Sequence, residues 1–151
     1  QGCTSLVSFT FPKKLTTINE YKNIIESNVR EFELNIRPGW LAINGKQMDM
    51  KRIDEVVPLG KTEIWRIKNP QRMPHPFHIH GCSFKIISRN GNKPYLNESG
   101  LKATVLLLSN ETVDIAIKFE YESTKKYPYM YHCHILEHDD AGMMVQFKVK
   151  I

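Results

Sequence analysis

The residues of this chain that could do chemistry are its histidines and one of its cysteines. All six histidines of the 151-residue sequence lie in two short segments, 75–80 and 132–138: His75, His78, His80, His132, His134 and His138. Successive side chains of a strand point to opposite faces of a sheet. If the first segment is a strand, His78 and His80 share one face and His75 lies on the other. In the second segment, Cys133 projects away from the two histidines beside it. Two such strands, if they are neighbours, place four imidazoles on one face and an imidazole with a thiolate on the other.

The face that carries the thiolate can be completed by residues that follow Cys133. His138 comes five residues later and Met143 comes ten residues later. Together with His75 they make two imidazoles, a thiolate and a thioether, which is the ligand set of a blue copper electron-transfer site. Structural zinc is the alternative interpretation. Zinc prefers four strong ligands in a tetrahedron, and it gives no reason for the methionine or for the other histidines.

The rest of the sequence is typical of an all-β protein, because short runs rich in branched and aromatic residues are separated by turn formers. The runs are 30–37, 41–44, 61–69, 76–80, 83–90, 103–109, 112–121, 127–134 and 143–151. Alternation in two of them predicts these inward-facing side chains: Val113, Ile115, Ile117, Phe119, Val145, Phe147, Val149 and Ile151. Many short strands at this spacing predict a two-sheet sandwich. Only 95–101 and 135–140 are expected to form one or two short helical turns.

Two segments resemble the copper signatures in the last domain of multicopper oxidases, the laccase and bacterial cuprous oxidase family. They are HPFHIHG at 75–81 and YHCHILEHDDAGMM at 131–144, and INGKQMDM at 43–50 extends the resemblance weakly. The resemblance implies a Greek-key, cupredoxin-like β-sandwich or barrel. Residues 28–151 would be the C-terminal cupredoxin (plastocyanin-like) domain. Residues 1–27 show no sustained period and are interpreted as the tail of a preceding domain with the interdomain linker.

The same resemblance implies a role for each ligand. The type 1 copper would be bound by His75, Cys133, His138 and Met143, the type 2 copper by His78, and the paired type 3 coppers by His80, His132 and His134. In the family, half of the histidines of the trinuclear type 2 and type 3 centre come from an N-terminal domain. This chain has no spare histidine, so its trinuclear centre is expected to be incomplete, and the chain inactive, without an N-terminal domain of the same protein.

The implied function is that of an oxidoreductase. A small reducing substrate, such as Cu(I) or a phenol, would give single electrons to the type 1 copper. They would pass through the His-Cys-His segment to the trinuclear centre, where dioxygen is reduced to water. Met73 is the methionine best placed for Cu(I), although scattered methionines also serve as core filler. The alternative is a stand-alone blue copper electron-transfer protein, which would leave His78, His80, His132 and His134 unexplained.

Asp139 is a candidate for a second catalytic role beside Cys133. It directly follows His138 and matches a position where relatives carry a carboxylate that feeds protons to the cluster, a role suited to an acid held near a metal. The other interpretation is that Glu137, Asp139 and Asp140 form a polar loop that covers the site.

The composition of the chain argues against nucleic acid and membrane as partners. The net charge of +5 comes from 21 basic and 16 acidic residues, without the basic, aromatic surface of a nucleic-acid-binding protein. No run is apolar enough to span a membrane. The resemblance to periplasmic enzymes implies a periplasmic or otherwise extracytoplasmic location. Cys82 is expected to be a small buried residue, and a disulfide between Cys3 and Cys82 stays open.

Overall fold

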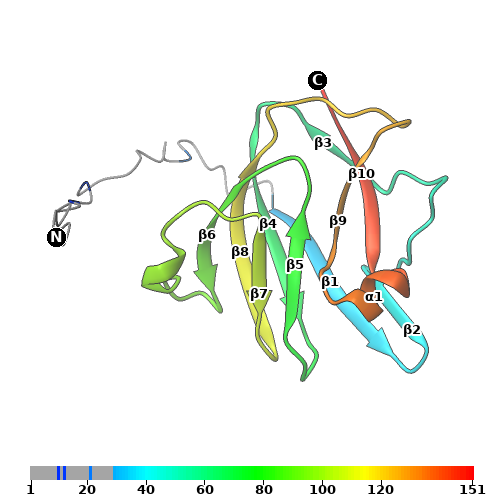
Figure 1. Ribbon diagram of the computed structural model, residues 1–151, viewed down its shortest axis with the longest axis horizontal. Coiled ribbons are helices and arrows are strands. Elements are labelled where there is room, and N and C mark those ends of the chain that lie inside the picture. The colour runs from blue at the N-terminus through cyan, green and yellow to red at the C-terminus, as the bar shows by residue number, and fades with distance from the viewer. Residues whose placement is uncertain (1–9, 11, 13–20, 22–28) are drawn as a thin grey trace, which may run out of the picture.

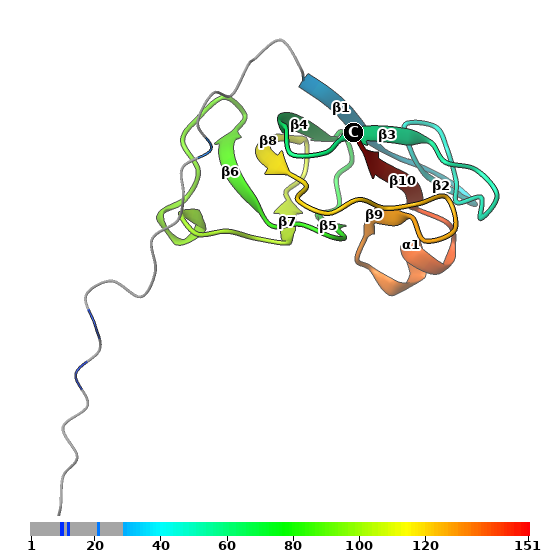
Figure 2. The same ribbon diagram turned by 90° about the horizontal axis from the view of Figure 1, so that it is seen from above.

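The chain folds into two sheets packed face to face, as seen in the computed structural model, which describes residues 10, 12, 21 and 29–151 (Figures 1 and 2). The first sheet has the order β2 (Trp40–Ile43), β1 (Val29–Arg37), β4 (Thr62–Asn69), β8 (Glu111–Lys118) and β6 (Phe84–Arg89). The second has the order β3 (Glu55–Pro58), β10 (Met144–Lys150), β9 (Tyr129–Cys133), β5 (His75–Ile79) and β7 (Thr104–Leu107). The predicted all-β sandwich is therefore confirmed.

Helical structure is confined, in the described residues, to the two places where the sequence predicts it. The 3-10 turn η1 (Leu96–Glu98) lies in the loop between β6 and β7. The helix α1 (Leu136–Asp140) connects β9 to β10 and lies beside both strands in Figure 1. No helix within the described residues is long and apolar enough to cross a membrane.

The core lies between the sheets and is rich in aromatic side chains. The predicted inward residues of β8, Val113, Ile115 and Ile117, are buried, as is Phe119 just beyond the strand. The Phe32 and Trp65 ring centroids lie 4.7 Å apart, and the Phe32 and Tyr131 centroids 4.8 Å apart. Because these rings come from β1, β4 and β9, they join the first sheet to the strand that carries Cys133.

Two details differ from the prediction. The strand β3 falls in a stretch for which the sequence predicts none, because its four residues are too few to show a period. It is held by parallel pairing with β10, in which Val57 lies opposite Val149. The prediction that Ile151 faces inward is wrong. Ile151 is 98% exposed, because β10 ends one residue earlier. The domain boundary predicted at residue 27 and the sulfur of Cys3 lie outside the described residues.

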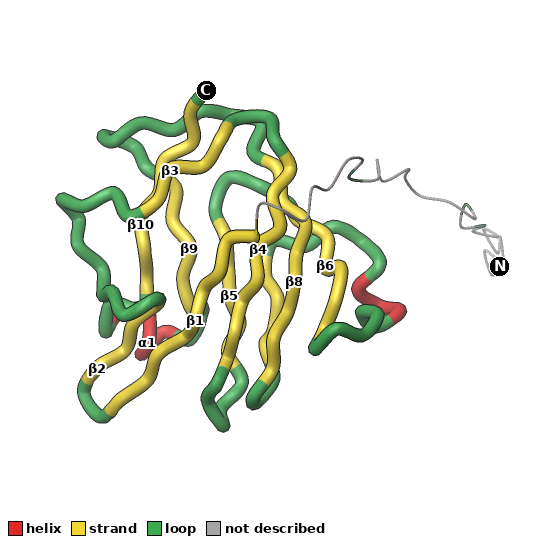
Figure 3. Tube along the Cα trace, turned by 180° about the vertical axis from the view of Figure 1, so that it is seen from behind, coloured by secondary structure: helices red, strands yellow, loops and turns green. Residues whose placement is uncertain are grey.

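The two outer faces of the sandwich differ in chemistry. On the first sheet, seen from its outer side in Figure 3, Arg66 of β4 forms two hydrogen bonds with the Asp114 carboxylate, at 2.8 and 3.0 Å. Lys68 Nζ lies 2.8 Å from a carboxylate oxygen of Glu31 on β1. Paired charges of this kind suit a face that stays in water. The outer face of the second sheet carries the histidines instead.

Gly81 allows the chain to turn after β5. Its φ is +76°, and a Cβ there would lie 2.6 Å from two ring carbons of Tyr129. The substitution Gly81→Ala is expected to lower the free energy of unfolding by roughly 2–4 kcal/mol, because strain at positive φ adds to displacement of the ring. Gly60→Ala is the control. Gly60 has a φ of +71° but no atom within 4 Å of an added Cβ, so it should lose only about 1–2 kcal/mol. Equal losses in urea unfolding would contradict the packing argument.

Candidate metal centre

The pairing of β5 with β9 brings the two histidine segments together. The strands are antiparallel neighbours, with His78 opposite His132 and Phe77 opposite Cys133. Side chains opposite each other on paired strands project to the same face. Phe77 and Cys133 therefore point into the sandwich, and His78 and His132 point outward. The arrangement on two faces that the spacing predicts is present.

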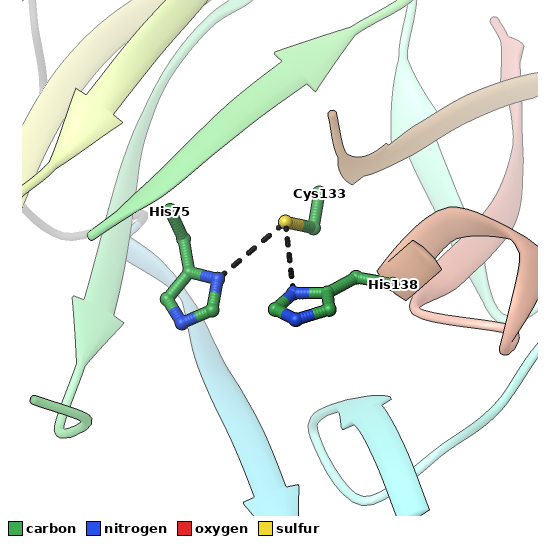
Figure 4. Close-up of side chains that lie close together, drawn as sticks. All are labelled: His75, Cys133 and His138. Atoms are coloured by element: carbon green, nitrogen blue, oxygen red, sulfur yellow. Dashed lines mark hydrogen bonds between the residues drawn. The ribbon is translucent and has the colours of Figure 1, made fainter. Parts of the chain in front are cut away.

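The inner group joins Cys133 to two imidazoles (Figure 4). Its Sγ lies 3.5 Å from Nδ1 of His75 and 3.6 Å from Nδ1 of His138. The two rings have their centroids 5.1 Å apart. His75 and Cys133 are fully buried, and the Nε2 of His75 has no hydrogen-bond partner among the residues that the structure describes. Both Nδ1 atoms and the sulfur thus converge on one buried point.

The loop after β9 positions His138 and Met143. His138 lies on α1, and its backbone N–H donates to Ile135 O at 3.0 Å. The backbone N–H of Met143 donates to His138 O at 2.9 Å, and Met143 O accepts from the N–H of Cys133 at 3.1 Å. Met143 is fully buried. The main chain therefore ties Cys133, His138 and Met143 into one compact loop.

The electrostatics of the inner group favour a bound cation. Burial, and then the neighbouring His138, lower the pKa of His75 to about 4, so that its imidazole is neutral near pH 7. Burial raises the pKa of the Cys133 thiol, which a backbone hydrogen bond from Ile135 partly offsets. A thiolate at this position therefore needs a positive charge beside it, and a metal ion supplies one. A soft thiolate and imidazoles are donors that suit copper, and a buried thioether, that of Met143, follows in the same loop.

The outer group consists of four imidazoles from β5, β9 and the residues that follow each strand. The nitrogens of His80 and His132 approach to 3.2 Å, both through Nε2, and His78 completes a set whose ligand atoms lie within 4.8 Å. The His134 ring centroid is 5.4 Å from that of His132 and 5.6 Å from that of His78. Burial, followed by neighbouring imidazoles, lowers the pKa of His80. Four imidazoles crowded in this way can share metal ions.

Asp139 lies beside one histidine of the outer group, His132. Its Oδ1 lies 3.6 Å from Nδ1 of His132, on the opposite side of that ring from the Nε2 that faces His80. This oxygen is buried and has no hydrogen-bond partner among the described residues. The adjacent acids Glu137 and Asp140 are not in this contact. The predicted proton-feeding residue is thus the one acid of the segment that lies against a histidine of the group.

Several contacts that support the site were not identified from the sequence. The Gln47 amide donates to Ala141 O at 3.1 Å, and Met48 N–H donates to Gly142 O at 2.9 Å, so the loop at 44–50 braces the turn before Met143. The sequence offered only a weak family resemblance in that loop. His78 is held by Ala103 and Thr104, through contacts that no local pattern signals.

Two further sulfur-containing residues were singled out in the sequence, Met73 and Cys82, and Cys82 belongs to neither group. Met73 is 47% exposed in the loop before His75. Cys82 is only partly buried, packs against the core and is a free thiol, and burial raises its pKa to about 12. The predicted buried environment of Cys82 is therefore correct only in part.

The chain is similar to known proteins along most of its length. The family model described as multicopper oxidase matches residues 10–151. A multicopper oxidase of Staphylococcus haemolyticus is 42% identical over 113 residues, which cover 72% of this chain and 24% of that protein. The cell division protein FtsP of Dickeya dadantii is 34% identical over 146 residues, covering 96% of this chain and 29% of FtsP.

Solved structures agree with these relatives. The multicopper oxidase of Pediococcus acidilactici superposes with a TM-score of 0.84 at 38% identity, over 95% of this chain and 30% of that one. The Campylobacter jejuni enzyme, called a metallo-oxidase, gives a TM-score of 0.80 at 30% identity, over 95% and 34%. The chain thus has the cupredoxin-like fold of these enzymes and spans about a quarter to a third of the length of its relatives. By its sequence, its fold and its two histidine groups, the chain belongs to the multicopper oxidase family.

Proposed function

We propose that this chain is the C-terminal copper-binding domain of a multicopper oxidase and that its two groups hold different coppers. The inner group, His75, Cys133, His138 and Met143, would hold the type 1 copper. The outer group would provide His78 to the type 2 copper and His80, His132 and His134 to the type 3 coppers. The proposal rests on one observation. Neighbouring side chains at the end of β9 point to opposite faces, so that Cys133 joins one group and the histidines beside it join the other.

The arrangement of β9 provides a direct route between the groups. When bound, copper would take single electrons from a substrate at the inner group and supply the reduction of dioxygen to water at the outer one. The main chain of Cys133 is covalently joined to His132 and His134. An electron on the sulfur therefore has a path to the outer imidazoles along bonds, without a jump through space. The hydrogen bond from Ile135 to the sulfur would tune this group.

The outer group needs ligands from another part of the protein. Four imidazoles on one open face provide half of the histidines of the family's trinuclear centre. We assign the remaining ligands to an N-terminal cupredoxin domain of the same protein, which would dock against this face. Two findings support this partner. Relatives are three to four times longer than the matched region. Two leucines beside the histidine segments are exposed: Leu106, which lies opposite Pro76, and Leu136, which follows His134 by two residues.

Asp139 would deliver protons to the outer group. Dioxygen reduction consumes protons, and an acid in contact with a ligating imidazole is suited to pass them on. The support is the buried Oδ1, which has no hydrogen-bond partner among the described residues and lies 3.6 Å from Nδ1 of His132. The hydrogen bond between Nδ1 of His132 and Cys133 O, at 3.1 Å, would hold the His132 ring in orientation.

A small reductant would reach the inner group from the side of Met73. This side chain is partly exposed and lies two residues before His75 in sequence. The amide of buried Asn69 donates to Met73 O at 2.9 Å and fixes the loop. A thioether at this position suits Cu(I) as the substrate, and a phenol is the second candidate. The periplasmic or otherwise extracytoplasmic location implied by the family resemblance remains part of this proposal.

Reconstitution tests the proposal. The chain is loaded with copper, its visible spectrum is recorded, and oxygen uptake is then measured before and after addition of the N-terminal portion of the protein. We expect a strong blue band without uptake, followed by uptake when the partner is present. A blue protein that never consumes oxygen would instead be a stand-alone electron-transfer protein. Absence of the blue band would contradict the type 1 site itself.

A further inference from the structure

The ring of His78 is held on the side that faces away from the other histidines. Its Nδ1 lies 2.9 Å from the carbonyl oxygen of Ala103 and 2.8 Å from Oγ1 of Thr104. Thr104 begins β7 and stands directly opposite His78 in the pairing of β5 with β7. Both contacts therefore come from one dipeptide on the edge strand of the second sheet.

The carbonyl oxygen of Ala103 decides which nitrogen of His78 carries the proton. A carbonyl oxygen only accepts hydrogen bonds, and a neutral imidazole has one N–H donor and one bare nitrogen. Nδ1 can therefore bond to Ala103 O only when the proton is on Nδ1. The hydroxyl of Thr104 accepts from the same N–H as a second acceptor. The lone pair of His78 is then on Nε2, the form of histidine in which that nitrogen can bind a metal.

The backbone alone does not account for this arrangement. The carbonyl of Ala103 also accepts from the backbone N–H of Ile79 at 3.2 Å, so it is shared between two donors. The Thr104 hydroxyl is the shorter contact. A branched residue is common in strands whatever its function, and valine has the same shape as threonine. The hydroxyl is therefore the group that would give Thr104 a positioning role, because the rest of its side chain is what any branched strand residue provides.

We propose that Thr104 is a positioning residue for the type 2 copper ligand, fixing His78 with its proton on Nδ1 and its Nε2 free to bind. The proposal rests on the proposed function for the identity of the metal, but the state of the ring exists without it. Partners that orient a ligating histidine in this way commonly contribute 10–100-fold to metal affinity.

The first test reads the ring directly in the full-length protein without copper. Nitrogen chemical shifts of labelled histidine distinguish the two neutral forms, and the His78 signals are identified by their loss in His78→Gln. We expect the proton on Nδ1. A proton on Nε2 would overturn the proposal, whether or not the protein proves to be an oxidase.

The second test compares two variants of the full-length, copper-loaded protein. In Thr104→Val, the copper that gives the type 2 signal in electron paramagnetic resonance should bind about 10–100-fold more weakly. Thr104→Ser, which keeps the hydroxyl, should bind it nearly as the parent does. The blue band of the inner group reports in each sample that the domain is folded. Equal type 2 affinity in Thr104→Val and the parent refutes the role of Thr104, whereas a parent that shows no type 2 signal counts against the proposed function instead.

Discussion

Replacing Cys133 by serine is expected to abolish the blue colour of the copper-loaded protein. The colour of such a site depends on a bond between copper and a thiolate, and Cys133 carries the sulfur that lies within 3.6 Å of both His75 Nδ1 and His138 Nδ1. A serine hydroxyl is a harder ligand that keeps its proton near pH 7. The visible absorption spectrum of the loaded protein measures the loss. Electron delivery to the outer group should fail with it, because the route that we propose begins at the sulfur.

Cys82→Ser is the matched control for this experiment. Cys82 is the other cysteine of the described region, and it belongs to neither metal group. Its thiol is partly buried and unreactive because burial raises its pKa to about 12. The variant should therefore keep the full blue band. A band that survives in Cys133→Ser, or that disappears in Cys82→Ser, would show that the inner group has been assigned incorrectly.

The largest loss of stability is expected from Arg89→Met. The Arg89 side chain is 7% exposed and forms hydrogen bonds to Glu98 at 2.6 and 2.8 Å and to Glu111 at 2.8 Å. Without the guanidinium, the carboxylate of Glu111, only 5% exposed, keeps one donor, the backbone N–H of Leu108. Breaking a buried ion pair from one side costs roughly 3–5 kcal/mol. Urea unfolding of the copper-free protein would measure this difference.

The effect of pH on the same variant has a definite sign. Hydrogen bonds from Arg89 hold the pKa of Glu98 below its ordinary value. A lowered pKa in the folded state gives stability that is present above the unfolded pKa and is lost as the pH falls through the folded one. Arg89→Met should therefore lose less stability on acidification than the parent does.

Arg66→Met is the control for Arg89→Met. Arg66 also pairs with a carboxylate on a neighbouring strand, but its side chain is 37% exposed on the outer face of the first sheet. An exposed pair contributes about 0–1 kcal/mol. If both variants lost the same stability, burial of the Arg89 network would have no special effect.

The alternation of side chains in the two histidine segments was enough to predict that the thiol and the imidazoles beside it lie on opposite faces. Because a strand has a period of two, the order His-Cys-His forces the thiol and the imidazoles onto opposite faces. The ligand types then made copper the metal of choice. The alternation in β8 likewise predicted Val113, Ile115 and Ile117 in the core, where they lie. A local sequence pattern predicts which side chains face the core where buried and exposed positions alternate regularly along a strand.

Contacts between distant segments were not predictable in the same way. The pair of His78 with Thr104 depends on the register of β5 against β7, and those strands are separated in sequence by β6 and the loop that contains η1. Asn69 is another case. Its side-chain amide donates to both Met73 O and Leu108 O, two carbonyl groups that are far apart in sequence. The strand β3 was missed because a parallel partner, rather than its own sequence, makes it a strand.

The register of β9 has a consequence for how this chain can change by insertion and deletion. Met144 lies opposite His132 on one side of β9, and Phe77 lies opposite Cys133 on the other. A shift of one residue turns every side chain of a strand to the other face. One residue gained or lost between Tyr131 and Cys133 would therefore disrupt both metal groups in a single event. The loop at 120–128 carries no ligand and can vary in length, so inherited length changes before this strand should be confined to that loop.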